Sequence, residues 1–463
     1  MDESGSPTSS SIKVAKPVRD WTQGSISRSL ISLSWPMIVS NSLNVLGPTI
    51  DTIWVGKLGT NDIAAVGIAG TIIMLVNALT VGIFTGLRSM VARNIGARDI
   101  EGANHVARQA FVLAIMYSVV LAAVGIFFSE QMLELLGAEP EIVSLGASYL
   151  RIQFVGMAAM TFRTMTDSTM QASGDTMTPM RLAVIFRILH FVLCPFLVFG
   201  WSFFPRLEIE GAAITNVLSQ SLGTVLGLWI LMSGRSRLRF NFHGYRFDPA
   251  VTWRINKIGI PSSLMSLQIQ LGQLILMRQV VVFGTIPLAG HTLSQRIDML
   301  LFMPLMGLGV SSGVLVGQNL GARQPQRAVK SSWTAVAYGQ GAMLFCVLCL
   351  MLWAEYVTGI FSSDPELIGV TSSFLRIACI NYTFLSLNII LSQSVNGAGD
   401  TLVPMIISIV STWALQIPLA IFLSQNANLG VFGVRWAMAA GSLVGALAYT
   451  IYFVLGRWKR KRL

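Results

Sequence analysis

Acidic side chains inside long apolar stretches are the groups in this sequence best suited to chemistry. Asp51 lies in GPTIDTIWVG, residues 47–56, among apolar and small residues. Hydrocarbon disfavours an ionised carboxylate, so an acid in such a stretch is a functional site by default, either protonated or facing water. Burial favours the protonated form, so Asp51 is a candidate for binding a proton on one side of a membrane and releasing it on the other. The alternative is an acid at the membrane interface, near Trp54 and Lys57.

His190 and Cys194, four residues apart in RILHFVLCP, are candidate neighbours of Asp51. If the chain starts in the cytoplasm, the segments that hold Asp51 and His190 both run outward. A rise of about 1.5 Å per residue then places Asp51 in the outer half of the bilayer and His190 near its middle. Three more polar residues reach the outer half by the same arithmetic: Tyr149, Thr215 and Asn216. An imidazole changes charge near neutral pH, so His190 is either the proton-transfer partner of Asp51 or a satisfied polar residue in the helix packing.

Two further acids fall at other depths. Asp167 shares a helix face with Tyr149 but lies about 27 Å from it, in the cytoplasmic half. It is either a later proton station or a carboxylate paired with Arg163, four residues away. Asp298, in QRIDMLLFMP, falls near the midplane and is the second candidate for proton coupling or for attracting a cationic substrate. Arg296 is two residues away and therefore points from a different helix face.

These acids need a membrane-spanning scaffold, and the composition predicts one. The chain of 463 residues is 53% hydrophobic and 11% charged, against about 25% charged in soluble domains. Apolar stretches of about 20 residues, enough for a helix to cross a bilayer, recur along it, and β-barrel alternation is absent. We expect an all-α polytopic membrane protein with twelve transmembrane helices. The expected spans are residues 30–55, 63–90, 106–128, 142–168, 179–200, 211–233, 256–283, 288–316, 332–354, 367–393, 403–424 and 431–456.

Basic and acidic connections alternate between these spans. Basic residues fall near residues 93–98, 235–257 and 323–330 and in the tail RWKRKRL, whereas acids fall near 130–139, 208–210 and 355–366. By the positive-inside rule, the basic connections and both termini are cytoplasmic, in a multi-pass protein of the cell membrane. The net charge of +11 is spread over several loops, which speaks against nucleic acid as a partner. The polar first 28 residues lack the apolar core of a signal peptide.

The two halves of the chain repeat at a constant offset of 225 residues. This shift superposes Pro36 on Pro261, NIGAR on NLGAR, and GDT at 174–176 on GDT at 399–401. Six spans per half make a parallel repeat, and transporters built this way bind substrate between the repeats and alternate their access by rocking one against the other. We expect a tail at 1–28, an N-lobe at 29–234, a linker at 235–255, a C-lobe at 256–456 and a tail at 457–463. The equivalent of Asp51 is Leu276, so the fold itself does not require an acid there.

Five stretches resemble the multidrug and toxic compound extrusion (MATE) family: WPMIVSNSLNVLGPTIDTIWVGKLG, VARNIGARD, QASGDTMTP, VGQNLGAR and NGAGDTLVP. The match spans residues 28–456. It implies a V-shaped fold with two six-helix lobes, and antiport of H⁺ or Na⁺ against organic, usually cationic, amphipathic compounds. The chain looks closer to the DinF-like branch, because its seventh and tenth spans lack the carboxylates that mark the NorM-like branch.

The chain departs from that branch at His190 and Cys194, where relatives commonly carry Asn and Asp. A two-acid proton relay therefore does not carry over directly, and Asp167 stands where relatives often have Asn. Pro36 interrupts the first span, and a hinge there that changes with protonation resembles what has been proposed for the family; a static kink fits equally well. We expect the substrate cavity to include Pro36, Asn44, Tyr149, Cys194, Thr215 and Asn216.

The combined prediction is a secondary active multidrug exporter that antiports protons against amphipathic, mostly cationic compounds. Proton coupling is assigned to Asp51, His190, Asp167 and Asp298, without a cofactor or a bound metal, in a monomer. The alternatives are a Na⁺-coupled exporter and a flippase of a lipid-linked substrate. A flippase would line its cleft with cationic side chains, whereas most arginines here are expected in loops. An enzyme is excluded because HExxH, GxSxG and nucleotide-binding motifs are absent and the four histidines are dispersed.

Overall fold

Long helices make up nearly all of the structure, as expected for the all-α class. The computed structural model describes residues 20–201, 204–241, 245–427 and 429–461, and no β-strand occurs within these ranges. The first six helices are α1 (Ile26–Val55), α2 (Thr60–Gly96), α3 (Ile100–Leu135), α4 (Pro140–Ser173), α5 (Met177–Phe199) and α6 (Glu208–Met232). The second six segments begin with α7 (Pro249–Val281), α8 (Thr285–Gly321), α9 (Pro325–Gly359) and α10 (Pro365–Gly397). They end with the continuous run α11 (Leu402–Ile409), a π-helix (Val410–Gln416) and α12 (Ile417–Gln425), followed by α13 (Phe432–Leu455).

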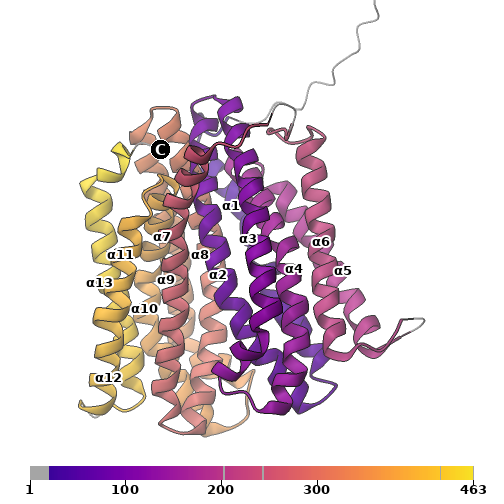
Figure 1. Ribbon diagram of the computed structural model, residues 1–463. Helices are drawn as coiled ribbons and strands as arrows, with labels where there is room; N and C mark the ends of the chain where they lie inside the picture. Colours follow the sequence, from indigo (N-terminus) through magenta and orange to yellow (C-terminus); the bar gives the residue numbers. More distant parts are fainter. Residues whose placement is uncertain (1–19, 202–203, 242–244, 428, 462–463) are drawn as a thin grey trace, which may run out of the picture.

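Each predicted span corresponds to one of these twelve segments, which lie side by side in Figure 1. Ten segments of the described chain are long and apolar enough to cross a membrane. The other two, α1 and α7, are richer in serine, asparagine and glutamine. Both pack against helices of the opposite half, α1 on α8 and α7 on α2. Their polar residues are therefore tolerated because protein, and not lipid, covers much of their surface.

The molecule has two chemically different ends. The basic end carries the α2–α3, α6–α7 and α8–α9 connections and the start of α1, and it lies at the top of Figure 1. The acidic end carries the α3–α4 and α9–α10 connections, with Glu134, Glu139 and Glu366. The alternation of charge predicted along the sequence therefore corresponds to two opposite faces of the helix bundle.

The two halves are lobes with matching local geometry. Arg98 and Arg323, at equivalent positions, both have a positive φ, of 61° and 59°. An ion pair is repeated as well: Arg151 lies 2.5 Å from Glu130, and the equivalent Arg376 lies 3.0 Å from Glu355. These pairs support the structural role that their symmetric positions suggest.

The lobe boundaries remain predictions, and residues 1–19, 242–244 and 462–463 of the predicted tails and linker lie outside the described residues. Within the described part, α7 begins at Pro249, inside the stretch expected as linker. The reason is a local start signal: the Asp248 carboxylate accepts hydrogen bonds from the N–H groups of Ala250 and Val251, and Pro249 occupies the first helical turn. In the C-terminal tail, Trp458 is buried and Lys461 lies 3.1 Å from Asp400.

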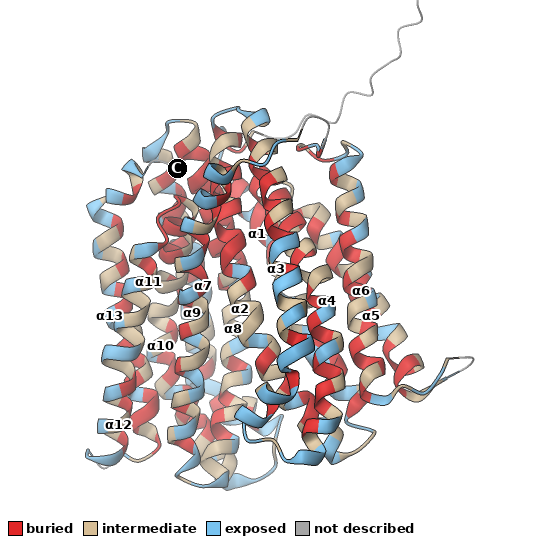
Figure 2. Cartoon of the chain, viewed as in Figure 1, coloured by how far each residue is buried: buried red, intermediate tan, exposed pale blue. Residues whose placement is uncertain are grey.

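Glycines bring the lobes into backbone contact in the half of the bundle nearer the basic end. A Cβ on Gly86 of α2 would lie 2.2 Å from the carbonyl oxygen of Ile255 in α7, and one on Gly96 would lie 1.9 Å from that of Gln318 in α8. Both distances are far shorter than a van der Waals contact, so only glycine fits. Figure 2 shows buried residues concentrated at this end of the bundle. The structure is therefore closed between the lobes at the basic end.

We predict that Gly86→Ala opens the lobes at the basic end, because its methyl group cannot fit against Ile255. The distance between spin labels at Glu101 and Gln326, which are exposed on opposite lobes, should lengthen. Gly70→Ala on the same helix, with open space around it, is the control and should leave the distance unchanged. An unchanged distance in both variants would contradict the assignment of this contact to lobe closure.

Candidate functional site

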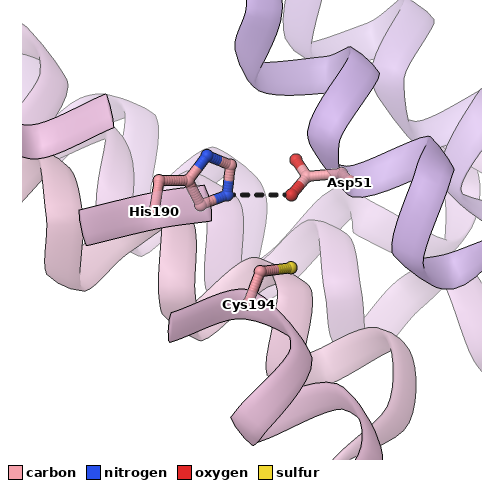
Figure 3. A group of neighbouring side chains, drawn as sticks. All are labelled: Asp51, His190 and Cys194. Carbon is pink, nitrogen blue, oxygen red and sulfur yellow. Dashed lines mark hydrogen bonds and ion pairs between the residues drawn. The ribbon is translucent and has the colours of Figure 1, made fainter. Parts of the chain in front are cut away.

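Asp51 and His190 form a buried hydrogen bond inside the N-lobe. His190 Nε2 on α5 lies 3.0 Å from Asp51 Oδ1 on α1, and their side chains are only 1% and 3% exposed. The two side chains point toward each other from separate helices, with Cys194 one turn further along α5 (Figure 3). The structure thus brings together three residues that the sequence placed at similar depths.

Arg187 extends this pair into a chain of three. One of its guanidinium nitrogens, Nη1, lies 3.0 Å from His190 Nδ1, and the other, Nη2, donates to the carbonyl oxygen of Asn44 at 3.4 Å. That carbonyl needs a donor because Pro48, four residues later in α1, has no N–H to offer it. Gly47 makes room for the guanidinium, since a Cβ there would lie 2.5 Å from Nη1. The sequence of α1 therefore creates the seat for Arg187.

The donors in this chain determine the tautomer of His190. A guanidinium only donates hydrogen bonds, so Nδ1 of His190 must accept. Its proton then sits on Nε2 and is donated to the Asp51 carboxylate. In this state the buried cluster holds one positive charge on Arg187 and one negative charge on Asp51. It is electrically balanced, and a proton added to Asp51 would leave a net charge of one inside the lobe.

The other residues expected around Asp51 lie mostly inside the N-lobe. Tyr149, Cys194 and Thr215 are at most 3% exposed. Gln153 donates to the Tyr149 hydroxyl at 3.1 Å, and Thr215 donates to the Gly211 carbonyl in its own helix.

The other three residues expected to line the substrate cavity lie in different surroundings. Asn216 is half-buried on α6. The Asn44 side-chain oxygen is buried without a partner among the described residues. Pro36 is buried in α1, and its carbonyl accepts a hydrogen bond from Ser40.

Asp51, His190 and Cys194 also form a possible metal-ligand set, because one ligand atom from each lies within 4.8 Å of the others. Nitrogen and sulfur donors suit zinc-like ions, whereas Na⁺ prefers several oxygen ligands. In this tautomer both ring nitrogens of His190 are engaged by Arg187 and Asp51, and the guanidinium repels cations. The donor set therefore does not match the oxygen ligands that Na⁺ prefers.

Asp167 is not part of this cluster. Arg163 Nη1, four residues earlier on α4, donates to its carboxylate at 2.7 Å, while Arg163 Nε donates to Gln220 of α6 at 2.6 Å. The pair is buried, with side chains 6% and 16% exposed. Asp167 thus forms the ion pair with Arg163 that the sequence suggested as the alternative to a proton station.

Asp298 belongs to a second cluster, in the C-lobe. Its carboxylate lies 3.1 Å from Arg435 of α13 and accepts a hydrogen bond from the Tyr382 hydroxyl of α10. Arg435 also donates to the carbonyl of His291, about two turns before Asp298 on α8. The Asp298 side chain is 24% exposed, against 3% for Asp51. Asp298 is therefore more accessible than Asp51 in this conformation.

The expectation that arginines lie mainly in loops is wrong for three arginines that are buried beside the acids or the free backbone groups described above. Arg163, Arg187 and Arg435 are buried inside helices because each neutralises an acid or bonds to freed backbone. Arg88 lies within α2, between the lobes, and among the described residues it donates to the Thr85 hydroxyl at 3.4 Å. The signal for Arg187 was present in the sequence, since it precedes His190 by three residues on one helix face.

Comparison with known proteins adds independent information. The family model MatE matches residues 36–196 and 261–422, one segment in each lobe. The probable multidrug resistance protein YpnP of Bacillus subtilis (strain 168) is 28% identical and covers 96% of this chain and 98% of its own. A FAD transporter of Shewanella oneidensis is 26% identical, over 91% of this chain and 93% of its own. A solved outward-facing conformation of a multidrug resistance MATE family transporter is 25% identical, with a TM-score of 0.88 over 95% of this chain and 98% of its own.

We predict that charge balance within the N-lobe cluster dominates its stability. Asp51→Asn leaves Arg187 as an uncompensated buried charge, which should destabilise the protein by about 3–5 kcal/mol. Adding Arg187→Met should recover most of that loss, because the charge is then gone. Thermal unfolding in detergent measures both effects, with Glu134→Gln at an exposed acid as the control. Additive losses in the double variant would contradict the pairing.

Proposed function

From the premise that this chain belongs to the MatE family, we propose that it is a proton-coupled multidrug exporter. Members of the family are membrane transporters, not enzymes, and the family model covers both lobes. The multidrug resistance proteins that it resembles support drug export as the activity. The coupling ion and the substrate charge are the parts that we infer from the buried clusters.

The proposed orientation places the basic end in the cytoplasm. The positive-inside rule favours this arrangement, and it puts both ends of the described chain on the cytoplasmic side of the cell membrane. The lobes are closed at the basic end, so the conformation is outward-facing in this orientation. Its similarity to a relative solved in an outward-facing conformation supports the same reading.

The hydrogen-bonded series of side chains Arg187–His190–Asp51 is the observation that supports proton coupling. Because the cluster is balanced with Asp51 ionised, it tolerates one additional positive charge far better than two. That charge is either a proton on Asp51 or the cation of a substrate nearby. A proton and a cationic substrate therefore compete, which is the thermodynamic requirement for exchanging one for the other.

The proposed cycle follows from this competition. In the outward-facing state a proton from outside neutralises Asp51, and the net positive charge that remains expels a bound cation. The lobes then reverse their access, and the proton leaves to the cytoplasm, which restores the balanced cluster. His190 transmits the change: once protonated, Asp51 can donate to Nε2, and the ring proton then lies on Nδ1, where it opposes the contact with Arg187. Asp298 is the proposed point of attraction for the cation, and Asp167 a later proton station or a fixed ion pair.

A second substrate class, amphipathic anions, is favoured by Arg88. No carboxylate among the described residues pairs with it, and it lines a small cavity between α2, α8 and α10. Asn396 lines the same cavity, is 1% exposed, and neither of its side-chain polar atoms has a partner. The relative described as a FAD transporter fits this class, as does a flippase of a lipid-linked substrate. Charge balance opposes it, because a proton would then assist binding and would not compete.

We predict that binding of a cationic dye to the purified protein releases about one proton, so that its Kd rises about tenfold per unit fall in pH. Protonation of Asp51 is the reason, and acid therefore weakens binding. Calorimetry in buffers of different ionisation enthalpy measures the released proton. Asp51→Asn should abolish both the release and the pH dependence, whereas Glu134→Gln should keep them. Release of a full proton by Asp51→Asn would place the coupling site elsewhere, with Asp298 as the next candidate.

Efflux from proteoliposomes tests the coupling ion. An imposed pH gradient should drive dye export, an imposed Na⁺ gradient alone should not, and Asp51→Asn should reduce proton-driven export on the order of tenfold or more. Export driven by Na⁺ alone would overturn the coupling assignment.

The substrate charge is tested with Arg88→Gln. If cations are the substrates, dye binding should be unchanged or tighter, because a nearby positive charge is removed. If anions are the substrates, the parent should bind a flavin dinucleotide and the variant should lose that binding by about tenfold or more. Binding of the flavin by the parent, with no effect of Arg88→Gln, would remove Arg88 from the site.

A further inference from the structure

A cavity opens between the lobes at the basic end, away from the buried clusters. It encloses about 480 Å³ between the ends of α2, α3 and α7. Helices α2 and α3 belong to the N-lobe and α7 to the C-lobe. The lining includes Arg93, His105 and Arg254 together with Met90, Asn94 and Val251.

Both arginines in this cavity lack an acidic partner. Among the described residues, no carboxylate is within ion-pair distance of Arg93 or Arg254. Arg93 Nη1 is buried and has no hydrogen-bond partner in the described structure. A buried guanidinium nitrogen without an acceptor is unfavourable, so the site is incomplete without an anion or another acceptor.

The acids around the cavity are already engaged. Asp248 lies 3.1 Å from His105. The pKa of Asp248 is lowered mainly by the hydrogen bond from the Val251 N–H, and next by the one from His105. Asp99 accepts from the Gly102 N–H at the start of α3. The segment 235–257 adds six basic residues against the single acid Asp248.

Exposed aromatic and apolar residues place this cavity at the surface of the bilayer. Beside it, Trp253 is 62% exposed and Phe247 is 52% exposed. Tryptophan favours the level of the lipid headgroups. Beyond that level the outer faces of α3 and α7 are apolar and exposed, as at Val119, Ile260 and Leu264. A molecule with an anionic head in the cavity could extend its apolar chains along these faces.

We propose that Arg93 and Arg254 bind the phosphate of an anionic phospholipid, and that this lipid holds the lobes together at the basic end. Basic pockets between transmembrane helices are established sites for such headgroups. Arg93 is on the N-lobe and Arg254 on the C-lobe, so lobe separation at this end would divide the site. The lipid therefore binds the closed arrangement more tightly and increases its population. The inference uses the orientation proposed above only to name the leaflet as cytoplasmic, and it does not depend on the transport cycle.

The test measures lobe separation with spin labels at Glu101 and Gln326, in vesicles of phosphatidylcholine alone or mixed with phosphatidylglycerol. Phosphatidylglycerol should raise the ratio of closed to open molecules on the order of tenfold. Arg93→Gln with Arg254→Gln should remove this shift. Arg235→Gln with Arg239→Gln, two exposed basic residues outside the cavity, is the matched control and should retain it.

Three results would overturn the proposal: no shift in the parent protein, equal loss of the shift in both double variants, or the same shift with inorganic phosphate added to phosphatidylcholine vesicles. The second would indicate a general effect of membrane charge, and the third a soluble anion. Native mass spectrometry of the parent protein supplies a measurement that needs no variant. It should retain phosphatidylglycerol in preference to phosphatidylcholine, and equal retention would also count against the site. None of these results depends on drug export.

Discussion

The cost of an unbalanced charge in a low-dielectric interior is the constraint on which this structure depends. Each lobe contains an acid and a buried arginine that balance each other's charge, the buried Asp51 with Arg187 through His190, and the partly exposed Asp298 with Arg435 directly. A carboxylate or a guanidinium buried without a partner of opposite charge is costly, so each acid and its arginine depend on each other. Neutral clusters of this kind can move with their lobe at little electrostatic cost. A single added proton or cation would remove this neutrality. The clusters are therefore sensitive to any charged group that binds near them.

The backbone of α1 provides the groups on which the N-lobe cluster is built. Pro48 frees the carbonyl of Asn44, and Gly47 leaves space beside it, so α1 presents an acceptor and a recess at one level. The Arg187 guanidinium occupies the recess, donates to that carbonyl and contacts His190, one turn further along α5. A proline in a transmembrane helix is therefore more than a kink here, because the hydrogen bond it removes is replaced by a bond from another helix. Movement of α1 relative to α5 would disturb the hydrogen bond between Asp51 and His190 directly.

The sequence predicted the scaffold well and the site only in part. The spans could be predicted because hydrocarbon thickness sets the length of a transmembrane helix. The two lobes could be predicted because specific residues repeat at an offset of 225 residues. Counting residues predicted neighbouring levels for Asp51 and His190, but a level along the helix does not give the direction in which a side chain points. Arg435 and Tyr382 reach Asp298 from helices more than 80 residues away in the sequence, which no local spacing reveals. The cavity between Arg93 and Arg254 likewise exists only once the lobes meet.

The duplicated fold separates structure from function in this chain. Features kept in both halves, such as the Arg151–Glu130 and Arg376–Glu355 pairs, maintain each lobe. The buried clusters are not duplicated: the residues equivalent to Asp51, Arg187 and His190 are Leu276, Thr412 and Leu415. Repetition would have placed two identical acid–histidine–arginine clusters in matching positions, with equal effects on both lobes. Because the clusters differ, a charge added to one of them would change the charge of that lobe alone, and this asymmetry would favour one arrangement of the two otherwise similar lobes over the other.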